Sequence, residues 1–213
     1  MKLLIVNGGP RLRGWNTAAM LEAAANGARE AGAEVETVNL YALDFKGCRS
    51  CFACQRVGAA ARCAAQDALT PVLNRILEAD ALLVGSPIYF GDVTGQTRSF
   101  FERLWFPGLS YDKARTVKYK KRIPVGLVFT MNVPSDAQYE PLFSQLAATM
   151  KRFFGPTEVL TATDTLQFDD YSKYVSDLFD AAAKRRRHET VFPEDLARAE
   201  ALGRRLAAGG CNE

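Results

Sequence analysis

Four of the five cysteines fall within one short stretch, as Cys48, Cys51, Cys54 and Cys63. The gaps between them are two, two and eight residues, and the first three thiols have a spacing typical of iron–sulfur ligands. An odd number of cysteines and the lack of a recognisable export signal argue against a disulfide framework. The segment is therefore a conditional cluster site. Zinc is less favoured, and plain thiols, either packed as small hydrophobes or redox-reactive, are the other alternative.

A second candidate site is the loop at residues 7–17 (NGGPRLRGWNT), which joins an apolar run to a helical stretch. Backbone N–H groups and the positive end of a helix dipole converge there, an arrangement that suits an anion. Asn16 or Thr17 can cap the helix and donate to phosphate oxygens, while Arg11 and Arg13 can add charge-assisted hydrogen bonds. The motifs G-x-x-x-x-G-K-[ST] and G-x-G-x-x-G are absent. A phosphomonoester is therefore expected rather than ATP or a Rossmann-bound dinucleotide.

The third candidate is residues 84–91 (VGSPIYFG), where an apolar strand predicted at 81–84 runs into a loop with proline and aromatic residues. Tyr89 and Phe90 offer faces for stacking, and Gly91 lets backbone approach a ligand closely. Packing of the two aromatic side chains in the core is the alternative, but it does not explain the flanking Gly and Pro. The loop therefore predicts a place for a flat ring.

Side-chain acid–base or nucleophilic chemistry has little support. The one histidine, His188, lies in a charged run far from the predicted strand ends, which disfavours a Ser-His-Asp or Cys-His arrangement. No cysteine is followed by the Cys-x5-Arg pattern of a phosphatase. We nominate no catalytic residue.

The elements that position these loops alternate along the chain. Apolar runs of strand length lie at 2–6, 35–40, 81–84, 123–130 and 158–162, and helical periodicity marks 17–31, 67–77, 100–105, 142–153 and the stretch after Pro193. Alternating strands and helical crossovers predict a doubly wound α/β fold, a five-stranded parallel sheet with helices on both faces. In such sheets ligands bind at the carboxyl ends of the strands, where the two loops would meet.

Length and composition limit the number of domains, the location of the protein and its partners. A chain of 213 residues with 48% hydrophobic content suits one domain, 1–213, with a sizeable core. No stretch reaches membrane-spanning length, and the run at 1–6 is too short for a signal peptide, so a cytoplasmic protein without membrane partners is expected. The basic run 184–187 lies beside acidic residues in a chain of net charge +3, which favours a solvated helix face over nucleic-acid binding.

Residues 163–192 depart from the alternation, because they form a connection far longer than an ordinary loop. This insertion before the last helix carries several aromatic residues, and 176–187 has helical character. A surface helix packed on the body is the simplest interpretation. A subunit interface or a flap near the ligand is the alternative.

The two loops resemble those of the flavodoxin-like NAD(P)H-dependent FMN reductases and the related iron–sulfur flavoproteins, and the resemblance spans most of the chain. Those proteins carry Gly-Ser-Pro-Arg followed by Gly-Asn-Thr, which here reads Gly8-Gly9-Pro10-Arg11 and Gly14-Trp15-Asn16-Thr17. Their Gly-Ser-Pro-Ile-Tyr-Phe-Gly loop is matched by residues 85–91. Gly9 replaces a serine hydroxyl and Trp15 is inserted, so phosphate contacts would depend more on the backbone.

The resemblance implies a flavodoxin-like fold, non-covalent FMN, NAD(P)H as co-substrate and a homodimer. The ring would lie on residues 87–92, with residues 130–132 at its other edge. The implied cofactor-binding set is Gly9, Pro10, Arg11, Arg13, Asn16, Thr17, Pro87, Ile88, Tyr89, Phe90, Gly91, Asp92, Thr130 and Asn132. The conditional 4Fe–4S ligands are Cys48, Cys51, Cys54 and Cys63.

The expected function is an FMN-dependent oxidoreductase that takes hydride from NAD(P)H and reduces a flavin, a quinone or a similar acceptor, either a small molecule or a redox protein. Such chemistry belongs to the flavin ring, and the protein supplies orientation and electrostatics. The alternative is an iron–sulfur flavoprotein that carries electrons to or from a ferredoxin-like partner. A third class, a flavin-binding regulatory protein without turnover, stays open.

Overall fold

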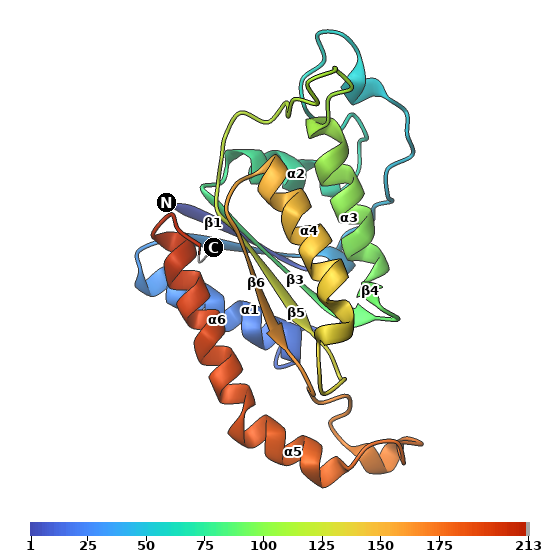
Figure 1. Ribbon diagram of the computed structural model, residues 1–213, viewed down its shortest axis with the longest axis vertical. Coiled ribbons are helices and arrows are strands. Elements are labelled where there is room, and N and C mark those ends of the chain that lie inside the picture. The colour runs from blue at the N-terminus through green and yellow to red at the C-terminus, as the bar shows by residue number, and fades with distance from the viewer. Residues whose placement is uncertain (212–213) are drawn as a thin grey trace.

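The computed structural model describes residues 1–211 (Figure 1). Five strands form a parallel sheet in the order β2-β1-β3-β5-β6, which confirms the predicted flavodoxin-like α/β fold. In the register of the centre, Val6 pairs with Val38 on one side and Val84 on the other. The strands are β1 (Lys2–Asn7), β2 (Glu34–Asn39), β3 (Ala81–Tyr89), β5 (Val125–Thr130) and β6 (Thr157–Ala162).

The sheet has a sixth strand that the sequence did not predict. β3 continues through Tyr89 rather than ending at Val84, and a turn at Phe90 and Gly91 leads into the short antiparallel strand β4 (Asp92–Val93). The predicted loop at 85–89 was therefore wrong. Pairing with β5 carries the strand forward, and β1 pairs with β3 only as far as Gly85. Pro87 therefore sits where one side of the strand is open and its missing N–H is tolerated.

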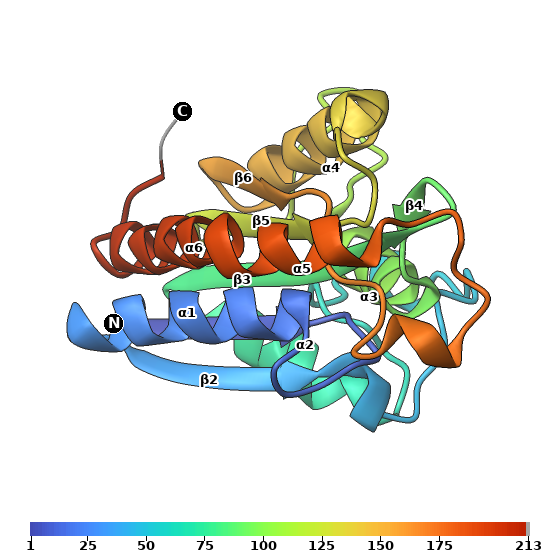
Figure 2. The ribbon, with the colours of Figure 1, turned by 90° about the horizontal axis from the view of Figure 1, so that it is seen from below.

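Helices cover both faces of the sheet, as predicted. One face packs against a core from α1 (Asn16–Glu30) and α6 (Phe192–Ala207), and the other packs against α2 (Leu69–Glu78), α3 (Gly95–Trp105) and α4 (Glu140–Phe153). Figure 2 shows α1 and α6 side by side across one face. No helix among residues 1–211 is long and apolar enough to cross a membrane.

Two glycines let α1 and α6 approach closely. A Cβ atom on Gly203 would lie 1.9 Å from the carbonyl oxygen of Ala24, and one on Gly27 would lie 2.1 Å from that of Glu200. No side chain larger than hydrogen fits at either position. The first and last helices of the chain are thus locked together over the sheet.

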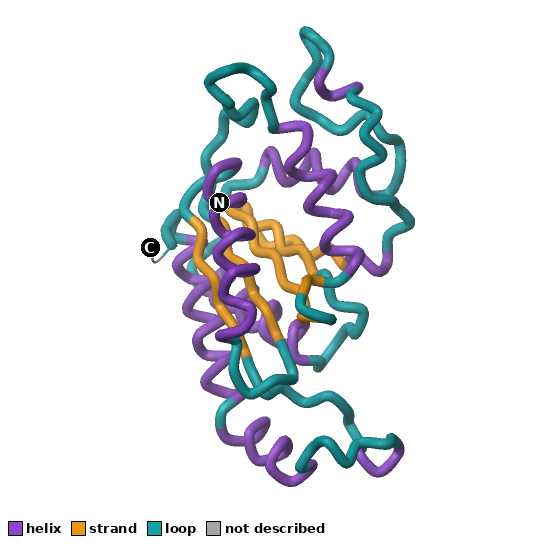
Figure 3. The backbone as a smooth tube through the Cα atoms, turned by 45° about the vertical axis from the view of Figure 1, so that its right-hand side comes forward, coloured by secondary structure: helices purple, strands orange, loops and turns teal. Residues whose placement is uncertain are grey.

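The long connection between β6 and α6 contains the 3₁₀ turn η5 (Tyr171–Lys173) and helix α5 (Ala181–Thr190) (Figure 3). The predicted helix at 176–187 is present with later bounds, because the Asp180 carboxylate accepts a hydrogen bond from the N–H of Ala183 at 2.9 Å and so fixes its start. The rings of Phe168 and Tyr174 stack with centroids 4.2 Å apart. The connection is therefore folded and packed.

The cysteine segment has little regular structure. It lies between β2 and α2, with one short 3₁₀ turn at Ala53–Gln55, and it lies at the end of the molecule opposite α5 (Figures 1 and 3). The remaining 3₁₀ turns are η1 (Leu40–Ala42), η3 (Phe106–Gly108) and η4 (Ala137–Tyr139).

Candidate functional site

A cavity of about 260 Å³ opens where β1, β3 and β5 reach their carboxyl ends. It brings together both predicted loops and the end of β5. The lining residues are Gly9, Pro10, Arg11, Trp15, Asn16, Thr17, Pro87, Ile88, Tyr89, Phe90, Thr130, Met131, Asn132, Thr165, Leu166 and Gln167. We call this the sheet-edge cavity.

The N-terminus of α1 opens into the sheet-edge cavity without a side-chain cap. The helix begins at Asn16 after Trp15, and no side chain of the described chain accepts a hydrogen bond from its first turn. The prediction that Asn16 or Thr17 caps α1 was wrong. The Asn16 amide instead donates to the carbonyl of Leu166 at 2.8 Å, and the Thr17 hydroxyl lies 2.6 Å from that of Thr130. The first-turn N–H groups are thus left for an anion.

Gly9 closes the other side of this N–H cradle. Its N–H donates to the Asn7 side chain at 2.9 Å, and a Cβ there would lie 3.2 Å from Asn7 Oδ1 and 3.5 Å from Pro87 Cδ. Side-chain atoms of Asn7, Pro87 and Thr17 thus surround the space that a side chain at this position would enter. The donors available, backbone N–H groups with hydroxyl and guanidinium groups close by, suit a phosphate monoester.

Arg11 is held over the cavity, whereas Arg13 is not part of it. The Arg11 guanidinium lies 4.2 Å from the centroid of the Trp15 ring and donates to the carbonyl of Gln167 at 2.7 Å. Arg13 has a φ of 33° and lines a separate groove beside α1 and β2. Trp15 was not among the predicted site residues, although its insertion in the loop was the signal that could have marked it.

The end of β3 and the following turn form the floor on which a ring could lie. Tyr89 is 43% exposed and Phe90 is fully exposed, in a turn where its φ is 51°. Burial raises the pKa of the Tyr89 hydroxyl above its ordinary value, so it stays protonated at neutral pH. Gly91 and Asp92, also predicted, do not line the cavity, and the Asp92 carboxylate lies 3.7 Å from Arg98.

The opposite wall joins the end of β5 to the long connection. Thr130 and Asn132 lie there, together with residues 165–167 of the insertion, for which a flap near the ligand was the alternative interpretation. Their proximity arises because the loops after β5 and β6 are paired. The N–H of Met131 donates to Ala162 at 3.0 Å and the N–H of Thr165 donates to Met131 at 3.1 Å.

Buried hydroxyl groups hold the two loops in fixed relation. Thr94 caps α3 and donates its hydroxyl to the carbonyl of Gly8 at 2.7 Å, while its N–H donates to Ser86 at 3.1 Å. The Thr97 hydroxyl lies 2.9 Å from that of Thr94. This network ties the β1–α1 loop to the end of β3, so the cavity is preorganised.

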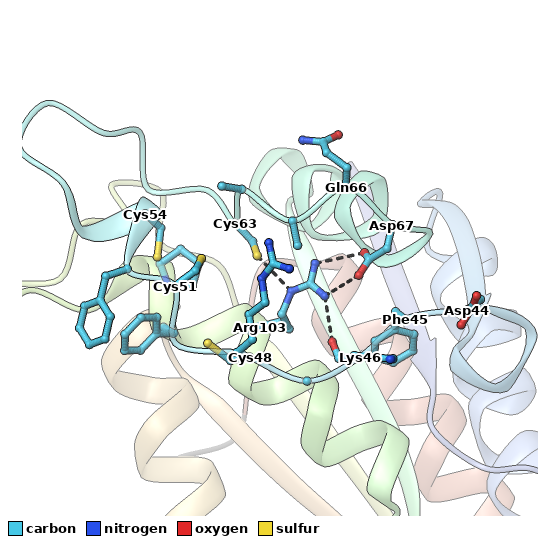
Figure 4. A pocket seen from close by; sticks show the side chains of 17 residues that line it. Asp44, Phe45, Lys46, Cys48, Cys51, Cys54, Cys63, Gln66, Asp67 and Arg103 are labelled. Atoms are coloured by element: carbon cyan, nitrogen blue, oxygen red, sulfur yellow. Dashed lines mark hydrogen bonds and ion pairs between the residues drawn. The ribbon is translucent and has the colours of Figure 1, made fainter.

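All four clustered cysteines line a second cavity, of about 500 Å³, which we call the thiol cavity (Figure 4). It lies between the loop after β2 and the C-terminal half of α3, and it shares no lining residue with the sheet-edge cavity. Cys51 is exposed and Cys54 is buried, whereas Cys48 and Cys63 are intermediate. Cys211 lies elsewhere, against the start of β5.

Arg103, only 3% exposed, projects into the thiol cavity from α3. Its Nε donates to Cys63 Sγ at 3.0 Å, its two Nη atoms donate to the Asp67 carboxylate at 2.8 and 3.1 Å, and Nη1 also donates to the carbonyl of Lys46. Burial alone would lower the pKa of Arg103, but the Asp67 and Cys63 contacts outweigh it and the pKa is raised. A permanent cation thus lies beside a sulfur atom.

The thiols differ in acidity. Burial, with the charges of Cys63 and Cys51, raises the pKa of Cys54, while a hydrogen bond from the backbone of Ala53 lowers that of Cys51. Four thiols around one cavity, with a buried cation, fit the chemistry of a negatively charged cluster. Within residues 1–211, however, no three Cys, His, Asp or Glu side chains are gathered as a metal site. His188 stacks on Phe192 and lines neither cavity.

An open parallel sheet with an anion cradle and a flat-ring floor at its carboxyl edge defines a flavodoxin-like protein. Residues 1–159 match the NADPH-dependent FMN reductase family, and the chain belongs to that family.

Iron–sulfur flavoproteins are among the relatives that are similar to this chain. Iron–sulfur flavoproteins from Archaeoglobus fulgidus and Methanocaldococcus jannaschii are 38% and 33% identical over 103 residues, which are 48% of this chain and 48% and 51% of theirs. The chain spans about half the length of the curated relatives it matches.

Solved structures share the fold over nearly the whole chain. An NAD(P)H:quinone oxidoreductase from Methanothermobacter marburgensis has a TM-score of 0.68 at 18% identity, with 97% of this chain and 98% of that one covered. An azoreductase from Bacillus anthracis has a TM-score of 0.68 at 15% identity, with 96% and 99% covered. At these identities the likeness establishes the fold.

Proposed function

We propose that this protein is an FMN-dependent oxidoreductase that takes hydride from NAD(P)H and reduces a flavin, a quinone or a similar acceptor. The observation that carries the proposal is the uncapped N-terminus of α1, which opens into the same cavity as the aromatic floor at Tyr89 and Phe90. Membership of the NADPH-dependent FMN reductase family supports it.

In this proposal the residues of the sheet-edge cavity bind and orient the cofactor. The first-turn N–H groups of α1, with Arg11, hold the phosphate. Pro87 and Tyr89 lie against the ring, and Thr130 and Asn132 approach its polar edge. When bound, FMN supplies a ring that accepts hydride and passes electrons onward.

Anaerobic purification followed by an ultraviolet–visible spectrum and addition of NADPH under argon tests the proposal. Flavin bands that bleach with NADPH, and recover when a quinone is added, are the expected result. If neither NADH nor NADPH reduces the bound flavin, the proposal is wrong and the protein binds flavin without oxidising nicotinamide. Failure of the purified chain to bind added FMN would overturn it entirely.

The thiol cavity favours a second candidate, an iron–sulfur flavoprotein that exchanges electrons with a ferredoxin-like partner. Four cysteines on one cavity with the Arg103 guanidinium among them support it, as do the names of the curated relatives. Iron and acid-labile sulfide assays on anaerobically purified protein test it. Cys63→Ser should lose iron and Cys211→Ser should retain it. Absence of iron in the wild-type protein after reconstitution would leave the cysteines as plain thiols.

We further propose that the protein acts as a homodimer, as the family resemblance implies. Apolar side chains are exposed at Phe90, which lines the sheet-edge cavity, and at Val175 and Leu178 on the long connection. Light scattering coupled to gel filtration would show twice the chain mass of 23.4 kDa. A monomer at micromolar concentration would contradict the proposal.

A further inference from the structure

Lys184 is a buried lysine in a helix that is otherwise strongly polar. Its side chain is 8% exposed, and its ammonium group donates to the Asn132 carbonyl at 2.7 Å, to Asn132 Oδ1 at 2.5 Å and to the Asp164 carboxylate. These contacts use all three protons of the ammonium group. One side chain of α5 is thus fully engaged with the two loops that follow β5 and β6.

The backbone around Asp164 is shaped to make this contact. Asp164 has a φ of 53°, in the left-handed region that a non-glycine residue seldom adopts. Its N–H donates to the Val133 carbonyl at 2.7 Å, which holds the loop against the end of β5. Such a conformation persists only where the surroundings enforce it, and here it delivers the carboxylate to Lys184.

The contact also determines which way the Asn132 amide faces. An ammonium group only donates hydrogen bonds, so the atom of Asn132 that meets Lys184 is the oxygen. The amide nitrogen is left over, and it donates to no group among residues 1–211. Asn132 itself lines the sheet-edge cavity, so its two N–H groups add to the hydrogen-bond donors on this wall.

We propose that Lys184 is a positioning residue for the flavin, which fixes the Asn132 amide so that its N–H groups donate to acceptor atoms on the edge of the ring. The inference rests on the proposed function of the sheet-edge cavity. The reduced ring holds more negative charge than the oxidised ring, so donors fixed in this way stabilise reduced FMN more than oxidised FMN.

The test compares the wild-type protein with Lys184→Met, Lys184→Arg, Asn132→Ala and the Lys184→Met/Asn132→Ala double variant. FMN dissociation constants, midpoint potentials of bound FMN and melting temperatures of the FMN-free proteins are measured. Lys184→Met should bind FMN about threefold to tenfold more weakly, the effect of about one lost hydrogen bond, and its potential should fall. Lys184→Arg, which also only donates, should restore most of both.

The double variant should bind FMN no more weakly than Asn132→Ala alone, because Lys184 acts through Asn132. Arg185→Met is the matched control: it removes an exposed cation from the same helix and should change FMN affinity by less than about twofold. Additive losses in the double variant would show that Lys184 affects FMN binding without acting through Asn132. A lowered melting temperature of Lys184→Met with unchanged affinity and potential would show that Lys184 only anchors α5. Either result would overturn the proposal. If wild-type protein binds no FMN, the proposed function fails and not this coupling.

Discussion

Arg103 shows how one buried cation organises the thiol cavity. It joins α3 to three separate points of the loop region, at Cys63, Asp67 and Lys46. Its bidentate contact with Asp67 is the geometry in which a guanidinium binds a carboxylate most strongly. The cavity therefore has a wall that holds its shape without a bound group.

The Asp67 carboxylate gives this wall a measurable pH dependence. The hydrogen bond from Arg103 lowers its pKa below the ordinary value of 3.8. A carboxyl group with a lowered folded-state pKa stabilises the fold above about pH 4 and loses that contribution as pH falls through the lower value. Asp67→Asn should reduce the free energy of unfolding by about 2 kcal/mol at pH 7.

Urea unfolding at pH 7 and at pH 3 checks this prediction. The difference between wild type and Asp67→Asn should narrow at pH 3, because below pH 3.8 the Asp67 carboxyl group takes up a proton more readily in the unfolded chain than in the folded chain. Asp177→Asn is a control, since Asp177 is exposed on the surface, and it should leave the free energy of unfolding nearly unchanged at both pH values. An equal difference at both pH values would mean that the carboxylate charge is not what matters.

Tyr89 gives the second prediction at this scale. Tyr89 lines the sheet-edge cavity and is 43% exposed. Tyr89→Ala should weaken FMN binding about twofold to tenfold, the range of one aromatic contact. Tyr111→Ala, an exposed tyrosine that packs against Phe52 near the cysteines, is the matched control and should leave FMN affinity unchanged. Fluorescence titration of the FMN-free proteins measures the FMN affinity of both variants. An unchanged affinity in the Tyr89 variant would show that the flavin ring does not lie on Tyr89.

At the scale of elements, the contact between α1 and α6 leaves no room for an added methyl group. Gly203→Ala would place a methyl group 1.9 Å from a backbone oxygen of α1, so the helices must separate. The expected loss is about 3 kcal/mol of unfolding free energy, typical of an overpacked core. Gly95→Ala, at the start of α3 with nothing within 4 Å of its added methyl, should change stability by less than about 1 kcal/mol. Urea unfolding measures both, and a stable Gly203 variant would contradict the close contact.

Elements that follow hydrophobic periodicity were predictable from the sequence, and those set by distant partners were not. The apolar runs of β1 and β5 and the stripes of α2 and α4 appear near their expected bounds. β3 exceeds its predicted length because β5 supplies pairing partners through Pro87, which no local pattern shows. The cap of α1 was mispredicted for the same reason, since Asn16 and Thr17 are drawn to Leu166 and Thr130.

The candidate site likewise contains some residues that could be predicted from the sequence and others that could not. Residues 9–11 could be placed at the sheet edge because they come shortly after β1, and residues 87–90 because they lie at the carboxyl end of β3. Residues 165–167 and Lys184 could not, because their approach depends on how the long connection folds back over the sheet. Arg13 was predicted by charge, but the backbone turn at that residue carries it to another groove.

For the whole molecule, the proposed site predicts strong stabilisation by its ligand. FMN at one hundred times its dissociation constant should add about 2.7 kcal/mol to the free energy of unfolding. For a chain of this size that corresponds to a rise of roughly 5–10 °C in melting temperature. Differential scanning fluorimetry with FMN and with riboflavin measures it. FMN should give the larger shift because of the α1 cradle, and equal shifts would argue against phosphate binding there.

The pairing of α1 with α6 has a consequence for synthesis on the ribosome. The apolar face of α1 emerges early, yet the helix that covers it is translated last among the described elements. At roughly 5–20 residues per second, that face waits on the order of ten seconds or more for its partner. Residues 165–167, which complete the cavity wall, also arrive late. The nascent chain therefore exposes the apolar face of α1 until α6 emerges, and chaperones can bind that face in the interval.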